Sequence, residues 1–283
     1  MTVLDRRLHV YRDDLADARL RGQVTAARFG EGQPARVAVP VADLRRAPRA
    51  DAGLDTQLLL GDTVQVYDEA DGWAWVQATR DNYVGYIPST DLAEAATAPT
   101  HVVSVPRTFV YPGPDMKLPA ARALSLGSQL AITGFEERRG THYALTASGE
   151  GLIARHLAPI DELAPDYVAV AETLERTPYL WGGASAFGID CSGLVQLSMR
   201  MAGRSVLRDS DMQASGLGEP IDPAQGRRRG DLVFWKGHAA ILTDPQTILH
   251  ANGHTMQVSR EGLADAVARI GYLYGQPTGY RRP

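Results

Sequence analysis

The sequence contains one cysteine, Cys191, among its 283 residues. A single thiol cannot form an intrachain disulfide or supply a multi-cysteine metal site, and it fits a reducing compartment. No apolar run approaches the roughly 18 residues of a membrane-spanning helix. Charged side chains occupy residues 5–7, where a secretory peptide would need an apolar core. These absences predict a cytoplasmic protein that does not enter a membrane.

An excess of charge of one sign is also missing. The 29 Lys and Arg residues against 33 Asp and Glu residues give a formal net charge of −4, so no basic field predicts a nucleic-acid partner. Apolar residues make up 44% and charged residues 22% of the chain, the composition of an ordinary globular protein. A chain of this length suits two or three domains.

An internal repeat follows a polar N-terminal arm, residues 1–35, in which we expect one short helix around residues 13–21. The segment 59–64 is echoed by 125–130, and 85–87 by 151–153, in both cases 66 positions later. Alternating apolar residues between turn residues predict short strands. These strands are expected at 63–67, 73–79, 83–88, 130–135, 143–147 and 150–154. Two small β-barrels, 36–97 and 98–160, are therefore predicted.

The pattern changes in the last part of the chain, residues 161–283. One-sided apolar spacing predicts helices over 166–176 and 190–202. Three strand-like segments follow, at 231–235, 239–243 and 247–251. A helix followed by an antiparallel sheet is typical of an α+β domain.

The candidate chemistry lies in this α+β domain. With Asp190 or its neighbour as a helix cap, Cys191 falls in the first helical turn, where unpaired N–H groups favour a thiolate. His238 begins a strand that can lie beside this helix and act as a general base, and a hairpin would bring His250 to it as the third residue that holds the tautomer. The Cys191 N–H and the Tyr179 hydroxyl are candidate oxyanion donors.

Plainer interpretations exist for each of these residues. A lone cysteine is most often an inert buried residue, and His238 or His250 would also fit a strand as a structural residue. Trp181 either contacts a substrate or packs against the helix, which is the commoner role of a tryptophan. No motif supports His9, His101, His142, His156 or His254.

Five motifs occur in a fixed order over residues 165–280 and resemble the NlpC-type peptidoglycan peptidases. They are Tyr-X-Trp-Gly-Gly at 179–183, Asp-Cys-Ser-Gly-Leu-Val-Gln at 190–196, Gly-Asp-Leu-Val-Phe-Trp at 230–235, Gly-His-Ala-Ala-Ile-Leu at 237–242 and Leu-His-Ala at 249–251. The two barrels resemble bacterial SH3-like domains. The resemblance implies an α+β papain-like catalytic domain preceded by two small all-β SH3-like barrels, with Cys191 as nucleophile, His238 as base and His250 as third residue.

The architecture is most similar to the γ-D-glutamyl-L-diamino-acid endopeptidases. This resemblance implies a small murein peptide as substrate, with a free L-alanine amine held by acidic and hydroxyl groups. The positions that match are Asp190, Ser192, Asp209, Asp55 and Tyr83. Asp55 is one methylene shorter than the glutamate usual in that group. Because intact wall has no free L-alanine amine, the resemblance implies recycling of wall peptides in the cytoplasm, without a metal, an organic cofactor or an obligate protein partner.

Two other functions stay open from the sequence. The same fold would serve as an amidase or acyltransferase on another small amide. A non-catalytic protein that binds wall peptides is the third possibility, although the set Cys191, His238 and His250 speaks against it.

Overall fold

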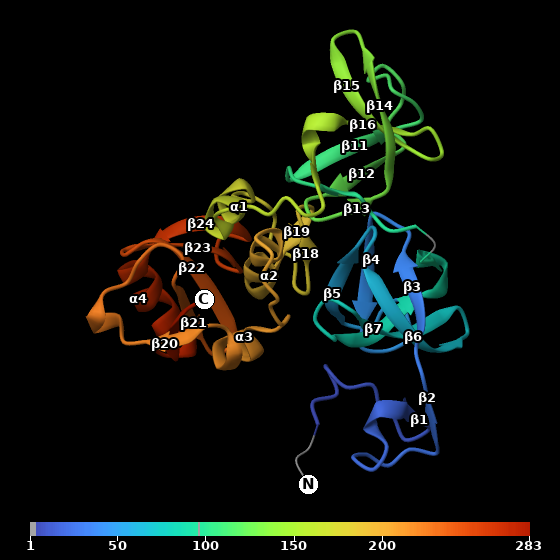
Figure 1. The fold of residues 1–283 in the computed structure, drawn as a ribbon. Coiled ribbons are helices and arrows are strands. Elements are labelled where there is room, and N and C mark those ends of the chain that lie inside the picture. The colour runs from blue at the N-terminus through green and yellow to red at the C-terminus, as the bar shows by residue number, and fades with distance from the viewer. Residues whose placement is uncertain (1–3, 96) are drawn as a thin grey trace. The chain divides into compact units, whose positions relative to one another are not determined.

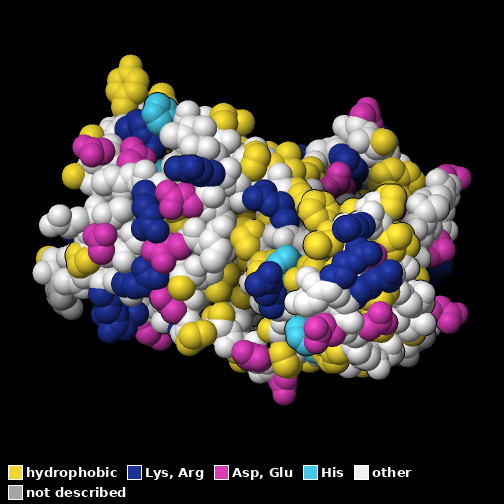
Figure 2. Space-filling view, turned by 90° about the horizontal axis from the view of Figure 1, so that it is seen from above, with side chains coloured by type: hydrophobic (Ala, Val, Ile, Leu, Met, Phe, Trp, Pro, Cys, Tyr) yellow, Lys and Arg dark blue, Asp and Glu magenta, His cyan; other side chains and the backbone are white. Residues whose placement is uncertain are grey.

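The computed structural model describes residues 4–95 and 97–283, which divide after Ile160 into two compact units (Figure 1). In the described residues no helix is long and apolar enough to cross a membrane. On the face shown in Figure 2, Lys and Arg side chains lie among Asp and Glu side chains instead of forming one continuous field. The mixed surface agrees with the small net charge of the sequence.

The N-terminal segment differs from the predicted arm. Its elements are β1 (Leu15–Asp17), a 3-10 turn (Ala18–Leu20) and β2 (Arg28–Gly30), so the helix expected around residues 13–21 is wrong. The Asp17 carboxylate accepts the N–H of Arg19 at 2.8 Å and the hydroxyl of Tyr67 at 2.5 Å. The first bond caps the start of the 3-10 turn, and the second ties the segment to the barrel that follows.

The first barrel is an antiparallel sheet in the order β5-β4-β8-β7-β6-β3-β9. Its strands are β3 (Gln33–Val37), β4 (Val41–Arg45), β5 (Leu54–Leu59), β6 (Thr63–Ala70), β7 (Trp73–Ala78), β8 (Val84–Pro88) and β9 (Leu92–Glu94). Alternate residues of β8 are buried, as expected for a strand with one face on the core. Since β3 already pairs with β6 from Gln33 onward, the barrel begins before residue 36.

The second barrel has the sheets β13-β10-β17 and β12-β11-β16-β15-β14. Its strands are β10 (His101–Val103), β11 (Arg107–Tyr111), β12 (Arg122–Ser125), β13 (Gln129–Leu130), β14 (Ile132–Arg138), β15 (Thr141–Thr146), β16 (Gly151–Ile153) and β17 (Leu157–Pro159). The repeated glycines Gly61 and Gly127 have φ values of 88° and 86°. A side chain at Gly61 would also lie 2.6 Å from the Gln129 carbonyl of the second barrel. The repeat therefore marks a turn that only glycine adopts without strain.

The second unit contains α1 (Tyr167–Thr173), α2 (Cys191–Met201), α3 (Ser210–Gly216) and α4 (Leu263–Tyr274). Its main sheet runs β20-β25-β21-β22-β23-β24. The strands are β20 (Glu219–Ile221), β21 (Leu232–Trp235), β22 (His238–Asp244), β23 (Thr247–Asn252), β24 (Gln257–Gly262) and β25 (Gly279–Arg282), and β18 (Ala184–Ser185) pairs with β19 (Gly188–Ile189) apart from it. The helices and strands predicted for this unit are present within two or three residues of their expected ends.

Two packing contacts position the site in this unit. Helix α4 contributes Leu263, Ala266 and Ile270 to the core that covers the sheet. Helix α2 packs on β22 and β23. Because β22 and β23 are antiparallel, the start of β22 lies beside the end of β23, and the start of α2 lies in the same region of the unit (Figure 1).

Candidate active site

Helix α2 begins at Cys191 because Asp190 caps it. The backbone of Asp190 is extended, and its Oδ1 accepts the N–H of Gly193 at 2.7 Å. A Cβ on Gly193 would meet the Gly183 carbonyl oxygen at 2.4 Å, so glycine lets the helix start press against the preceding turn. The thiol consequently lies in the first turn, as the sequence predicts.

The thiol of Cys191 is buried beside the start of β22. Its Sγ lies 4.0 Å from the Gly237 carbonyl oxygen, and the N–H groups of Ala239 and Ser192 donate to the sulfur. Burial, followed by the nearby Asp190 charge, raises the pKa of Cys191 to about 12. Desolvation therefore raises the pKa of the thiol by more than the helix N-terminus lowers it. The resting group is a thiol, not the thiolate that the sequence favoured.

The two histidines are brought together by the hairpin of β22 and β23. Nε2 of His238 lies 2.9 Å from Nδ1 of His250. Burial lowers the pKa of His238 to about 3 and that of His250 to about 4. Both imidazoles are therefore neutral at neutral pH, which leaves a proton acceptor available on this side of the site.

Arg208, which no sequence motif indicates, holds together the part of the site that contains Cys191 and the start of α2, called here the nucleophile side. Its guanidinium is 1% exposed and contacts both carboxylate oxygens of Asp190, at 3.0 and 2.6 Å. It also donates to Ser192 Oγ at 2.8 Å and to the Gly183 carbonyl at 3.2 Å. Nothing in a single arginine between Leu207 and Asp209 signals this role, because the contact depends on the fold of the chain between residues 190 and 208.

Asp190 is predicted to bind the free amine of a substrate, but donors of the protein itself already occupy its carboxylate. Its carboxylate already accepts from Gly182 N–H at 2.9 Å, Gly193 N–H, Ser192 Oγ at 3.3 Å and both nitrogens of Arg208. A carboxylate has about four acceptor positions. Asp190 is therefore a structural cap in this structure, and a contact between it or Ser192 and a substrate amine stays a prediction that requires one of these bonds to break.

The other residues predicted on the nucleophile side lie in or near the same loops. The Tyr179 hydroxyl has its pKa raised, first by burial and then by the charges of Cys191 and Asp190, which agrees with a position close to the thiol. Trp181 is 69% exposed, so the expectation that it packs against the helix is wrong. Asp209 directly precedes α3, and its side chain does not cap that helix.

Asp55 and Tyr83 belong to the first unit. Asp55 lies on β5 and its Oδ1 is 2.8 Å from Arg46. Tyr83 is 4% exposed, and its N–H donates to Asp81 at 3.1 Å. The contact of either residue with a substrate stays a prediction.

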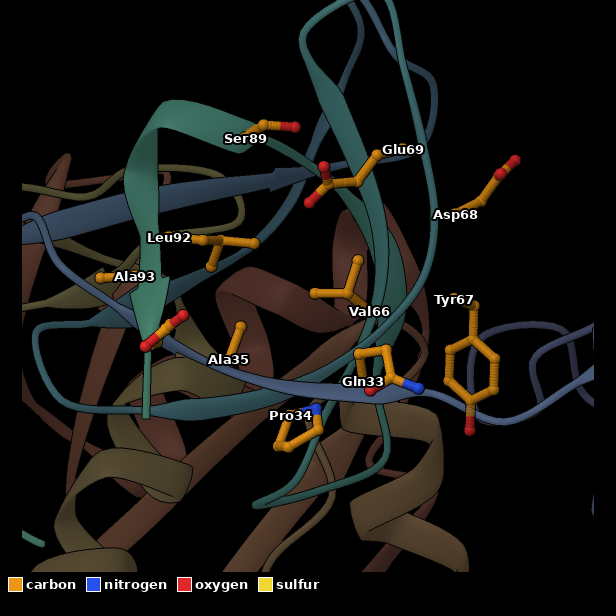
Figure 3. A pocket seen from close by; sticks show the side chains of 11 residues that line it. Gln33, Pro34, Ala35, Val66, Tyr67, Asp68, Glu69, Ser89, Leu92 and Ala93 are labelled. Carbon is orange, nitrogen blue, oxygen red and sulfur yellow. The ribbon is translucent and has the colours of Figure 1, made fainter. Parts of the chain in front are cut away.

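A cavity of about 530 Å³ lies on the first barrel, along β9, β3 and β6. Figure 3 shows Val66, Ala35 and Leu92 in its floor and Glu69 at its side. None of the residues singled out by the sequence lines it. Among the described residues, no three His, Cys, Asp or Glu side chains gather in a way that would hold a metal ion.

Comparison with known proteins adds independent observations. Residues 176–268 match the NlpC/P60 family, and residues 44–92 match the bacterial dipeptidyl-peptidase SH3 domain. The chain is 28% identical to dipeptidyl-peptidase 6 of Lysinibacillus sphaericus, over 83% of this chain and 97% of that protein. It is 29% identical to gamma-D-glutamyl-L-lysine dipeptidyl-peptidase of Bacillus subtilis, over 68% of each chain.

A solved structure has the same fold. An NlpC/P60 family protein from Bacillus cereus superimposes with a TM-score of 0.73 at 22% identity, over 88% of this chain and 99% of that one. The predicted fold class, an NlpC-type papain-like domain preceded by an all-β SH3-like region, is confirmed.

Proposed function

We propose that the protein, whose residues 176–268 match the NlpC/P60 family, is a cysteine endopeptidase acting on cell-wall peptides. The bond it hydrolyses joins γ-D-glutamate to an L-diamino acid, in peptides whose L-alanine amine is free. One observation carries this proposal: a buried thiol at a helix start lies beside a strand whose first residue, His238, is paired with His250 at 2.9 Å. The names of the relatives support the choice of bond.

The chemistry follows from the neutral resting state. His238 takes the proton of the Cys191 thiol as the sulfur attacks the γ-glutamyl carbonyl, and the negative charge moves to the carbonyl oxygen. The Cys191 N–H and the Tyr179 hydroxyl donate to this oxyanion. The imidazolium then returns its proton to the departing amine of the diamino acid, which leaves a thioester. Water, deprotonated by His238, hydrolyses the thioester and regenerates the thiol.

Recognition of the peptide requires a partner for its free amine. An ammonium group that leaves water requires a carboxylate partner, or its desolvation opposes binding. Asp209 is the acidic candidate of the second unit, and Trp181 is available on the surface of that unit. Substrate contacts of Asp55 and Tyr83, which belong to the first unit, stay predictions from the resemblance. A requirement for a free amine would restrict the enzyme to released peptides, so we assign it to wall-peptide recycling in the cytoplasm.

Product analysis tests the proposal. L-Ala-γ-D-Glu linked to diaminopimelate or to lysine is digested, with and without acetylation of the alanine, and the products are weighed by mass spectrometry. We expect release of L-Ala-γ-D-Glu from the free peptides only and no release by Cys191→Ala. His142→Ala, which removes an exposed histidine of the second barrel, is the matched control and should cleave at the wild-type rate.

Other results would redirect the assignment. Equal cleavage of free and acetylated peptides would keep the peptidase activity but would remove both the amine requirement and the recycling role that depends on it. No cleavage of either peptide would favour an amidase or acyltransferase acting on another small amide. Binding of the peptides without turnover would favour a protein that only binds wall peptides.

A further inference from the structure

The histidine pair continues to a carboxylate that the reaction above does not use. Nε2 of His250 lies 3.1 Å from Oε2 of Glu261, on the neighbouring strand β24. The His250 side chain is fully buried. Glu261 is in turn held by Arg269 of α4, with nitrogen–oxygen distances of 2.9 and 2.5 Å. The resulting chain of contacts runs from His238 through His250 and Glu261 to Arg269.

The carboxylate is the group that serves this buried nitrogen. In the described part of the chain, Nε2 of His250 is buried and makes no well-aligned hydrogen bond, and the Glu261 carboxylate oxygen at 3.1 Å is its ion-pair partner. Burial alone would raise the pKa of Glu261, but the hydrogen bonds and charge of Arg269 lower it, so the group is a carboxylate at neutral pH. An acceptor with a full negative charge therefore faces Nε2, and it favours a proton on that atom.

A proton on Nε2 of His250 decides the tautomers of both rings. A neutral imidazole carries one proton, so Nδ1 of His250 must then be an acceptor. The 2.9 Å contact is satisfied only when His238 donates through its Nε2. Nδ1 of His238 is left without a proton, as a base for the thiol requires. The opposite arrangement would place a bare Nε2 against a carboxylate and a proton on Nδ1 of His238.

We propose that Glu261 is a positioning residue of the active site, which acts through His250 to leave Nδ1 of His238 as the proton acceptor. The inference rests on the proposed function for its meaning in catalysis, since it assigns His238 as the base. Its structural content, the tautomer of each ring, holds independently of any substrate. The titratable groups that face His250 are His238, Glu261, Arg269 and His254.

Nitrogen NMR of the full chain labelled at histidine tests the tautomers directly. We expect both His238 and His250 to carry their proton on Nε2, with signals assigned by single-histidine replacements. In Glu261→Leu, a population of His250 with the proton on Nδ1 should appear. In Glu261→Gln, the amide oxygen can still accept from Nε2, so the wild-type tautomers should be kept. A wild-type His238 protonated on Nδ1, or unchanged tautomers in Glu261→Leu, would overturn the proposal.

Kinetics on the same variants separate positioning from binding. We expect kcat to fall about 10- to 100-fold in Glu261→Leu, as for other residues that orient a reacting imidazole, with KM within about twofold and recovery of most activity in Glu261→Gln. Glu175→Gln removes another surface glutamate paired with an arginine, Arg260, at 3.2 Å, and should leave kcat unchanged. A fall in Glu175→Gln as large as in Glu261→Leu would contradict a specific role.

The two readouts keep the hypotheses apart. If no peptide is cleaved but the tautomers follow Glu261 as expected, the proposed function fails and the positioning role stands. If peptides are cleaved but Glu261→Leu leaves kcat and the tautomers unchanged, the function stands and the positioning role fails. Thermal melting of Glu261→Leu identifies a folding defect, and Glu261→Gln then serves as the deciding variant.

Discussion

The two sides of the candidate site are each held by an arginine–carboxylate pair, but the pairs differ in burial. On the nucleophile side, the side chains of Arg208 and Asp190 are 1% and 12% exposed. On the base side, the side chains of Arg269 and Glu261 are 26% and 20% exposed. Asp190 also binds backbone N–H groups around the start of α2, whereas Glu261 touches one imidazole.

The difference shows how one kind of ion pair serves two purposes. A buried pair is costly to break, because removing one partner leaves a charge without solvent or counter-ion. A partly exposed pair can rearrange toward water, so its loss costs little stability. The buried pair of Arg208 and Asp190 therefore holds the backbone around Cys191 rigid. The pair of Arg269 and Glu261, on the side of His238 and His250 (the base side), instead controls the position of a proton.

Replacing Cys191 or His238 by alanine should reduce turnover more than any other change considered below. Cys191→Ala deletes the proposed nucleophile, so turnover should vanish. His238→Ala keeps the thiol but loses its base, and kcat should fall about 10²- to 10⁴-fold, the usual contribution of general acid–base catalysis. Peptide turnover followed by mass spectrometry measures both. Wild-type rates in either variant, with the fold intact by circular dichroism, would remove that residue from the mechanism.

Replacing the arginine of each ion pair shows how much each pair contributes to the free energy of unfolding. Arg208→Met leaves the Asp190 carboxylate buried without its counter-ion, and the free energy of unfolding should fall by about 3–5 kcal/mol. Arg269→Met opens a partly exposed pair and should cost about 1 kcal/mol or less. Urea unfolding of the full chain measures both variants under identical conditions. Equal losses would show that burial does not distinguish the two pairs.

The free energy of unfolding should depend on pH in opposite directions for the two sides of the site. The folded pKa values of His238 and His250 lie below the ordinary 6.5, so their contribution is complete above pH 6.5 and is lost as the pH falls. The folded pKa of Cys191 lies above the ordinary 9.0, so its contribution is complete below pH 9 and is lost as the pH rises. Each group changes the free energy of unfolding by roughly 1.4 kcal/mol per pH unit in its window.

Two variants test which residues cause the loss of stability at acid pH (the acid limb) and at alkaline pH (the alkaline limb). The free energy of unfolding is measured against pH under reducing conditions. His250→Asn should flatten the acid limb, and Cys191→Ala the alkaline limb. A variant that alters the opposite limb, or neither, would contradict the assigned pKa directions.

Trp181→Ala should have the smallest effect on stability, because the side chain is 69% exposed. The free energy of unfolding should change by no more than about 0.5 kcal/mol, while KM rises if the ring contacts the peptide. Thermal melting and steady-state kinetics measure the two quantities. A loss of stability comparable to that of Arg208→Met would mean that Trp181 belongs to the rigid part of the nucleophile side.

Much of the fold follows from local patterns. Alternating residues and turn glycines such as Gly61 predict the barrels, and the cap at Asp190 predicts α2, because these signals act between residues close in sequence. The helix expected around residues 13–21 is wrong because Asp17 binds Tyr67, fifty positions away, and this contact replaces the local preference. Arg208 and Glu261 were missed for the same reason, since each reads locally as a surface charge.

The sequence by itself determined the order of the domains, the class of the catalytic fold and the three residues expected to carry the reaction. Each of these depends on motifs that short segments contain in full. Only the tertiary structure decided the protonation of the site, because desolvation of Cys191, His238 and His250 depends on everything packed around them. It also decided which charges support the reacting groups, because ion pairs such as Arg208 with Asp190 and Glu261 with Arg269 exist only once separate elements are packed together.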